Sequence, residues 1–95
     1  SQSDCIFCKI VSNEIPSTRL FEDDVCIAFN DLNPQAPHHI LIVPREHFDS
    51  LDKAEDGHKT TLGHLVLTAA NIARDTGFAD DGYRVVINTN ADGGQ

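Results

Sequence analysis

One stretch decides the fold of this chain: residues 29–47, FNDLNPQAPHHILIVPREH. Its first part ends an apolar run and places a carboxylate, Asp31, ahead of a turn bounded by Pro34 and Pro37. Regular strand pairing cannot pass through these prolines, because neither carries a backbone N–H. The apolar run that follows, His39–Val43, predicts a new strand. The stretch therefore predicts two strands joined by a loop that carries an acid and a pair of histidines.

The strands predicted along the chain belong to an antiparallel sheet. They cover residues 18–23, 25–29, 39–43 and 83–88. Asp23-Asp24 predicts a hairpin turn between the first two strands. Because residues 39–43 are almost continuously apolar, we expect that strand at a central position, covered on both faces.

Two helices complete the expected elements, a short one at residues 7–12 and a long one from Lys59 to Thr76. The long segment carries apolar residues at helical spacing. Asp56 suits the N-cap, and Gly77 suits the left-handed position that ends a helix. The fold class is therefore α+β, an antiparallel sheet with one short and one long helix, and residues 1–95 are expected to form a single domain.

The composition limits the kinds of molecule that we expect the protein to bind. Seven Lys and Arg stand against 15 Asp and Glu, a net charge of −8, whereas nucleic-acid-binding proteins usually need a clustered basic face. A single nucleotide remains compatible, because backbone N–H groups can hold phosphates. The apolar runs are far shorter than the ~20 residues that span a bilayer. Three cysteines, an odd number, suit a reducing compartment, so we expect a cytoplasmic protein without nucleic-acid or membrane partners.

Asp31 has two interpretations. A carboxylate at the end of a strand can accept one hydrogen bond from each hydroxyl of a vicinal diol, such as a ribose. An aspartate in Asn-Asp-Leu-Asn-Pro can equally form a turn by binding nearby backbone amides.

Cys5 and Cys8 have the spacing of two ligands to one tetrahedral zinc. A redox pair and two small buried residues are the alternatives. A redox pair normally follows a strand within a thioredoxin-like unit, and only four residues precede Cys5. Zinc is therefore the preferred interpretation.

The segment Asp92-Gly93-Gly94-Gln95 follows the predicted strand that ends at Asn88. Two consecutive glycines let a backbone approach a ligand and direct N–H groups at an anion. Asp-Gly is also the most common hairpin turn signal, so the segment by itself is a weak indication.

Together, the stretch 29–47, the Cys5-Ile6-Phe7-Cys8 motif and the segment 92–95 resemble the histidine triad (HIT) nucleotide-binding family, in particular its Hint branch. The resemblance covers essentially the whole chain. It implies the HIT-like fold, and it implies that the family's His-x-His-x-His strand, with the catalytic nucleophile, is expected after Gln95. The domain is thus expected to be C-terminally incomplete, with the final catalytic strand missing.

The resemblance also implies roles for individual residues. Asp31 would hold the ribose, and His39 would support the catalytic histidines. His47 would be a third zinc ligand beside Cys5 and Cys8, with the fourth expected after Gln95. The remaining nucleotide-binding residues would wall the base or donate to phosphate: Phe7, Ile10, Phe29, Leu32, Asn88, Gly94 and Gln95. Ordinary core packing is the alternative for the apolar ones.

The implied function is binding of a purine nucleotide and hydrolysis of nucleoside phosphoramidates or adenylates through a nucleotidyl-histidine intermediate. The 95 residues alone lack the nucleophile and are expected to be inactive. The alternatives are a non-catalytic, zinc-stabilised nucleotide-binding or interaction module and a dithiol redox protein. The resemblance further implies a homodimer through the long helix and the strand at residues 83–88.

Overall fold

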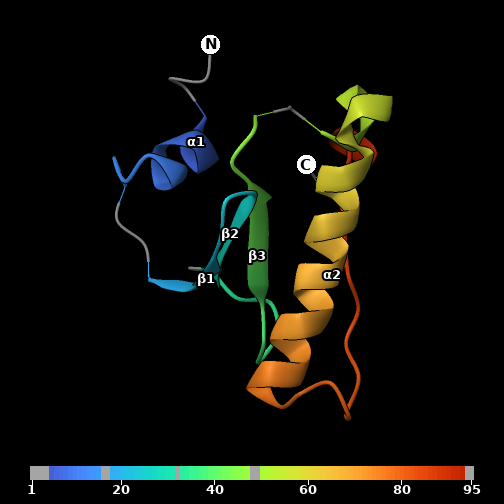
Figure 1. The fold of residues 1–95 in the computed structure, drawn as a ribbon. Helices are drawn as coiled ribbons and strands as arrows, with labels where there is room; N and C mark the ends of the chain where they lie inside the picture. The colour runs from blue at the N-terminus through green and yellow to red at the C-terminus, as the bar shows by residue number, and fades with distance from the viewer. Residues whose placement is uncertain (1–4, 16–17, 32, 48–49, 94–95) are drawn as a thin grey trace. The chain divides into compact units, whose positions relative to one another are not determined.

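The computed structural model describes residues 5–15, 18–31, 33–47 and 50–93. The chain divides into two compact units, Ser1–His47 and Phe48–Gln95. The first unit contains α1 (Ile6–Val11), β1 (Arg19–Glu22), β2 (Cys26–Asn30) and β3 (Ile40–Pro44) (Figure 1). The second contains the long helix α2 (Lys59–Thr76) and the short 3₁₀ turns η2 (Leu51–Lys53), η3 (Asp56–His58) and η4 (Ala91–Gly93).

The strands of the first unit form a three-stranded sheet in the order β1-β2-β3. Both pairs are antiparallel, with Glu22 opposite Ile27 in one and Asn30 opposite Ile40 in the other. This sheet, together with a short and a long helix, confirms the predicted α+β class and the three predicted strands of this region.

The position of the third predicted strand was wrong. Within the described residues β3 pairs only with β2, and β2 is the central strand. Burial agrees, since Cys26–Phe29 of β2 are buried and every residue of β3 is half-buried. Continuous apolar sequence predicts burial but cannot identify which strand has two neighbours.

The core of the first unit joins the short helix to the sheet. Ile10 from α1 packs with Ile27 and Phe29 from β2. Partly buried apolar side chains surround them: Val11, Ile15, Leu41 and Val43. The alternation along β2 therefore directs Ile27 and Phe29 at the helix.

The turn between β1 and β2 is built by Asp23, as its sequence predicts. The carboxylate oxygen Oδ1 accepts hydrogen bonds from the backbone N–H groups of Val25 at 2.8 Å and Cys26 at 2.9 Å. The Asp23 N–H donates to the carbonyl of Cys26 at 3.0 Å. A side chain that mimics backbone pairing in this way fixes the hairpin register.

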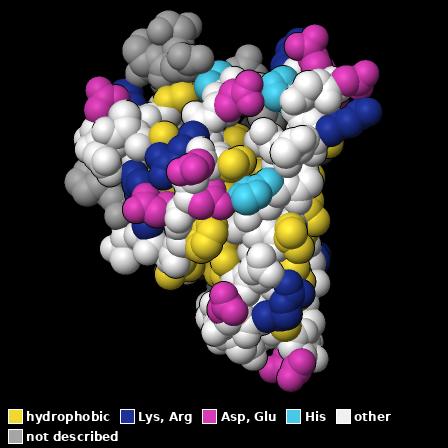
Figure 2. Space-filling view, in the orientation of Figure 1, with side chains coloured by type: hydrophobic (Ala, Val, Ile, Leu, Met, Phe, Trp, Pro, Cys, Tyr) yellow, Lys and Arg dark blue, Asp and Glu magenta, His cyan; other side chains and the backbone are white. Residues whose placement is uncertain are grey.

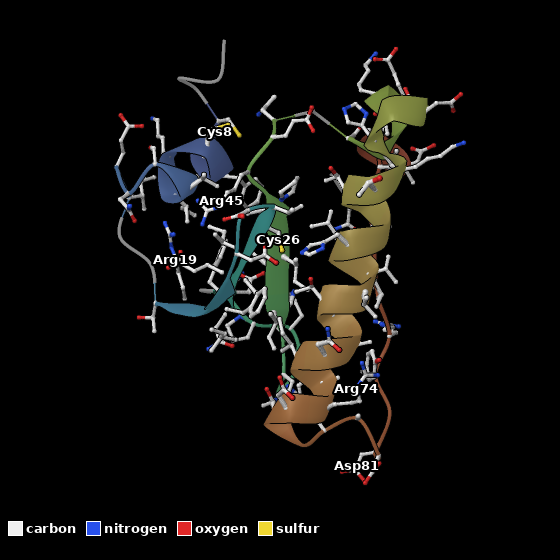
Figure 3. All side chains as sticks on the ribbon, in the orientation of Figure 1. Cys8, Arg19, Cys26, Arg45, Arg74 and Asp81 are labelled. Carbon is white, nitrogen blue, oxygen red and sulfur yellow. The ribbon has the colours of Figure 1, made fainter. Side chains whose placement is uncertain are left out.

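Arg19 connects β1 to the end of α1 (Figure 3). Its guanidinium donates to the carbonyl of Ile10 and to Oδ1 of Asn13, both at 2.8 Å. Asn13 has a φ of 68°, a left-handed conformation that asparagine tolerates well. The carbonyls at the end of a helix lack partners within the helix, and Arg19 donates to two of them, those of Ile10 and, at 3.4 Å, Val11.

Helix α2 has the predicted bounds, and Gly77 ends it with a φ of 93°. Its N-terminus differs from the prediction. Asp56 lies within η3, and His58 occupies the N-cap position of α2. A capping box formed by Glu55 and His58 accounts for the difference, since each side chain accepts from the other's backbone N–H.

Burial along α2 follows the predicted stripe only in part. Of that stripe, Ile72 and Ala73 are buried, whereas Val66 is 52% exposed. Outside it, Thr68 is buried and Leu67 is 59% exposed. Figure 2 shows hydrophobic side chains on the surface in the region of α2. Among the described residues, no helix combines the length and apolar character needed to span a membrane.

The predicted strand at residues 83–88 was wrong for the described structure. The segment carries no strand pairing with any other described residue. Its consecutive valines, Val85 and Val86, are 50% and 61% exposed. Side chains of consecutive residues in an extended chain point to opposite faces, so both faces of this segment are open. A strand forms only when its backbone pairs with that of another strand, and the local sequence does not determine whether such a partner is present.

Candidate functional site

The loop between β2 and β3 brings Asp31 and His39 together. The Asp31 N–H donates to the His39 carbonyl at 2.9 Å, which closes the loop through its backbone. The His39 side chain also reaches Asp31, with Nε2 3.3 Å from Oδ2. Both residues are half-buried.

The contacts of Asp31 are compatible with both roles that its sequence suggests, a turn residue and an acceptor for the hydroxyl groups of a ligand. Its Oδ1 accepts the backbone N–H of Asn33 at 2.9 Å, as a turn-forming aspartate does. Its side chain nevertheless keeps about a quarter of its surface exposed, 25%. A carboxylate offers about four acceptor positions, so one turn bond and one histidine contact leave capacity for hydroxyl groups of a ligand.

Sequence reasoning missed Gln35. Its backbone N–H donates to Nδ1 of His39 at 2.9 Å, and its side-chain amide donates to the Asn33 carbonyl at 3.2 Å. No motif marks this residue. The nearby Pro34 and Pro37 mark the loop, but a backbone-to-imidazole bond depends on how the loop closes.

The residues expected to wall a base have different surroundings. Ile10 and Phe29 are 7% and 5% exposed and belong to the core of the first unit. Their core role is thus established, and contact with a base stays a prediction. Phe7 is 42% exposed on α1 and is available to a ligand. Leu32 lies outside the described residues.

Of the expected phosphate-binding residues, the structure describes Asn88, which is exposed in the second unit. The backbone of Gly93 approaches it closely, since a Cβ built on Gly93 would lie 3.7 Å from the carbonyl carbon of Asn88. Asn90 has a φ of 58° and turns the chain between them. Gly94 and Gln95 lie outside the described residues.

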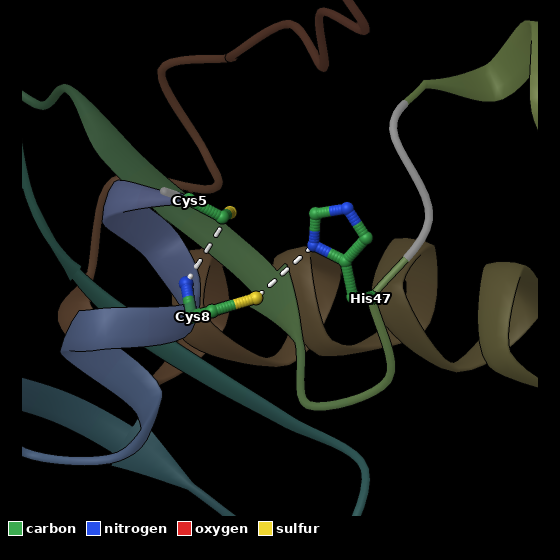
Figure 4. A group of neighbouring side chains, drawn as sticks. All are labelled: Cys5, Cys8 and His47. Carbon is green, nitrogen blue, oxygen red and sulfur yellow. Dashed lines mark hydrogen bonds between the residues drawn. The ribbon is translucent and has the colours of Figure 1, made fainter. Parts of the chain in front are cut away.

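Cys5, Cys8 and His47 form a cluster at the start of α1 (Figure 4). Their ligand atoms all lie within 4.8 Å of one another. Nδ1 of His47 is 3.0 Å from the sulfur of Cys8, and the sulfur of Cys5 accepts the Cys8 N–H at 3.4 Å. Ligand atoms around a tetrahedral zinc are separated by roughly 3.5–3.8 Å, so small side-chain movements would suit this donor set.

The two thiols have different acidities. Burial raises the pKa of the Cys5 thiol, but hydrogen bonds from the backbone of Cys8 and Phe7 and from the side chains of Cys8 and His47 lower it more, and its pKa lies below the ordinary value. Burial raises the pKa of Cys8, and so does the neighbouring Cys5. The thiolate is the form that binds metal or attacks a disulfide, and Cys5 reaches it more readily.

Comparisons with known proteins decide the family. The sequence model described as "Scavenger mRNA decapping enzyme C-term binding" matches residues 4–93. The chain is 46% identical over 90 residues to the purine nucleoside phosphoramidase of Escherichia coli K12, a match that covers 95% of this chain and 76% of that enzyme. A solved histidine triad protein from Clostridium difficile superposes with a TM-score of 0.95 and 49% identity, over 100% of this chain and 83% of that one.

The chain belongs to the histidine triad family. A HIT family hydrolase from Legionella pneumophila is also similar, with a TM-score of 0.94 and 41% identity over 97% of this chain and 82% of that one. These matches confirm the HIT resemblance and the HIT fold predicted from the motifs. The HIT proteins similar to this chain include a hydrolase and a phosphoramidase.

Proposed function

We propose that this HIT protein binds a purine mononucleotide or nucleotide conjugate and hydrolyses nucleoside phosphoramidates or adenylates. The observation that carries the proposal is the Asp31 carboxylate at the end of β2, half-buried and with unused acceptor capacity. The similarity to a phosphoramidase over almost the whole chain supports the same substrate class. A vicinal diol is the natural partner for such a carboxylate.

In the proposed reaction, an imidazole nitrogen attacks the α-phosphorus of the nucleotide conjugate. The bond to the leaving amine breaks, and the amine departs with a proton. Water then attacks the nucleotidyl-imidazole and releases the mononucleotide, which restores the histidine. We expect this histidine after Gln95, so residues 1–95 would supply binding, with Asn88, Gly94 and Gln95 donating to phosphate oxygens.

We also propose a structural zinc ion held by Cys5, Cys8 and His47, with a fourth ligand expected after Gln95. Two sulfurs and one imidazole nitrogen match the donor types of structural zinc sites. The ion would tie the start of α1 to the segment after β3 and would take no part in the reaction.

Two further properties belong to the proposal. The protein would be a homodimer, supported by the exposed Val66 and Leu67 on α2. It would be cytoplasmic, in keeping with three cysteines that form no disulfide within the described residues.

Turnover of adenosine 5′-phosphoramidate by the intact protein tests the function. We expect release of AMP, and no release by a polypeptide limited to residues 1–95. An intact, folded protein that binds AMP but releases none from the phosphoramidate would contradict the hydrolase.

That outcome would instead support the second candidate, a non-catalytic, zinc-stabilised nucleotide-binding module. The Cys5–Cys8–His47 cluster favours it, because a metal-supported binding unit needs no nucleophile. A dithiol redox activity would require reversible formation of a disulfide between Cys5 and Cys8. Their position at the start of a helix is compatible with that activity, but the adjacent His47 completes a metal donor set.

A further inference from the structure

Both ring nitrogens of His39 are engaged by the loop that precedes it. Nδ1 accepts the backbone N–H of Gln35 at 2.9 Å, and Nε2 lies 3.3 Å from Oδ2 of Asp31. The main chain closes the same loop through the bond from the Asp31 N–H to the His39 carbonyl. Asp31 and His39 are therefore connected twice, once through the backbone and once through their side chains.

The bond from Gln35 determines which nitrogen carries the proton. A neutral imidazole has one N–H and one acceptor nitrogen. A backbone N–H can only donate, so Nδ1 must be the acceptor and the proton must be on Nε2. The nitrogen of neutral His39 that carries the proton is therefore the one that lies 3.3 Å from Oδ2 of Asp31.

This contact restricts the orientation of the carboxylate. The bond from the Asn33 N–H holds Oδ1 of the carboxylate and leaves Oδ2 without a partner from this amide. The His39 contact on Oδ2 restrains the second oxygen as well, so rotation of the carboxylate about the Cβ–Cγ bond is limited from both sides. Both oxygens then keep unused acceptor positions in fixed directions, and a preorganised group binds with a smaller entropic cost.

We propose that His39 is a positioning residue that controls ribose discrimination: by fixing the plane of the Asp31 carboxylate, it makes the site distinguish a ribonucleotide from its 2′-deoxy analogue. The proposal rests on nucleotide binding by Asp31. A site arranged to accept from two vicinal hydroxyls disfavours a ligand that lacks one, because an acceptor loses its partner. A carboxylate that is free to turn adapts to a single hydroxyl, and discrimination falls.

Two substitutions separate the functions of the two ring nitrogens. In His39→Asn, the amide oxygen can replace Nδ1 as the acceptor for Gln35, but the shorter side chain offers no donor to Oδ2 of Asp31; the Asn33 N–H still donates to Oδ1. In His39→Gln, the longer amide can donate to Asp31. His38→Asn is the matched control, since His38 is the exposed neighbour on the same loop.

The measurement is the ratio of dissociation constants for 2′-deoxyadenosine 5′-monophosphate and AMP, determined by calorimetry on the intact protein. We expect a ratio on the order of tenfold in the parent protein and in His38→Asn. His39→Asn should bring the ratio close to unity, whereas His39→Gln should keep most of the ratio of the parent protein. In the background of Asp31→Ala, His39→Asn should cause no further change.

An unchanged ratio in folded His39→Asn would overturn the proposal, as would an equal fall in His38→Asn. If His39→Asn does not fold, the ratio in His39→Gln decides, and a value near unity would count against the proposal. Binding of neither nucleotide would refute the proposed function and ribose discrimination with it. The nitrogen chemical shifts of the His39 ring show which nitrogen carries the proton, and they can be measured without any nucleotide. A proton on Nδ1 would refute the positioning of Asp31 by His39.

Discussion

At the scale of single residues, Asp31 carries the proposed nucleotide binding. We expect Asp31→Ala to weaken AMP binding by about 1.5–3 kcal/mol, the cost of losing hydrogen bonds to a charged acceptor. Calorimetry on the intact protein measures the change. Asp31→Asn is the control for the turn, because asparagine can still accept from the Asn33 N–H. Equal affinity in the parent protein and a folded Asp31→Ala would leave Asp31 as a turn residue only.

Glu22 makes the stability of the first unit depend on pH. The hydrogen bond from Arg19 holds the pKa of Glu22 below its ordinary value; burial opposes this shift, and the charges of Arg19 and Arg45 add to it. Arg45 lies 3.5 Å from the carboxylate. Because the folded pKa is below that of the unfolded chain, about 4.3, the stabilisation is present above that value and is lost as pH falls through the folded pKa.

We therefore expect Glu22→Gln to lower the free energy of unfolding near pH 6 and to lower it less near pH 3, because the stabilisation by the ionised carboxylate is lost as pH falls toward and through the folded pKa. Urea denaturation at the two pH values measures this. The loss should be modest, since Glu22 is on the surface and solvent screens the pair. A loss of equal size at both pH values would assign the effect to packing.

At the scale of elements, zinc would join α1 to the end of β3. We expect about one zinc per chain in protein purified without chelator, and none in the double variant Cys5→Ser with Cys8→Ser. Elemental analysis measures the content. Zinc that survives the double substitution would place the ligands elsewhere.

The elements that sequence predicted well are those with local causes. The bounds of α2 follow from a helical apolar stripe and Gly77, and the β1–β2 turn follows from Asp23. The segment at residues 83–88 has strong strand propensity, yet strand formation depends on a partner far along the chain. The same distinction applies to the candidate site: the motif drew attention to Asp31 and His39, which lie close together in the structure, but not to the backbone bond from Gln35 to His39.

At the scale of the whole molecule, the proposed homodimer should depend on the exposed face of α2. In a two-fold interface each substitution is introduced twice. We expect Val66→Arg or Leu67→Arg to shift the intact protein from dimer to monomer, as measured by light scattering at micromolar concentration. Asp75→Arg, at an exposed charged position of the same helix, is the control. A monomeric parent protein would contradict the dimer.

Because residues 83–88 have no strand partner among the described residues, the exchange of their amide protons can show whether such a partner is present. Exposed amides without strand pairing exchange with solvent at rates close to those of an unstructured peptide. Covering the segment with another strand, from this chain or a second copy, would slow the exchange of alternate amides, because only one edge pairs with each neighbour. Deuterium uptake by Tyr83–Asn88 would therefore report directly whether, and on which edge, the strand finds its partner.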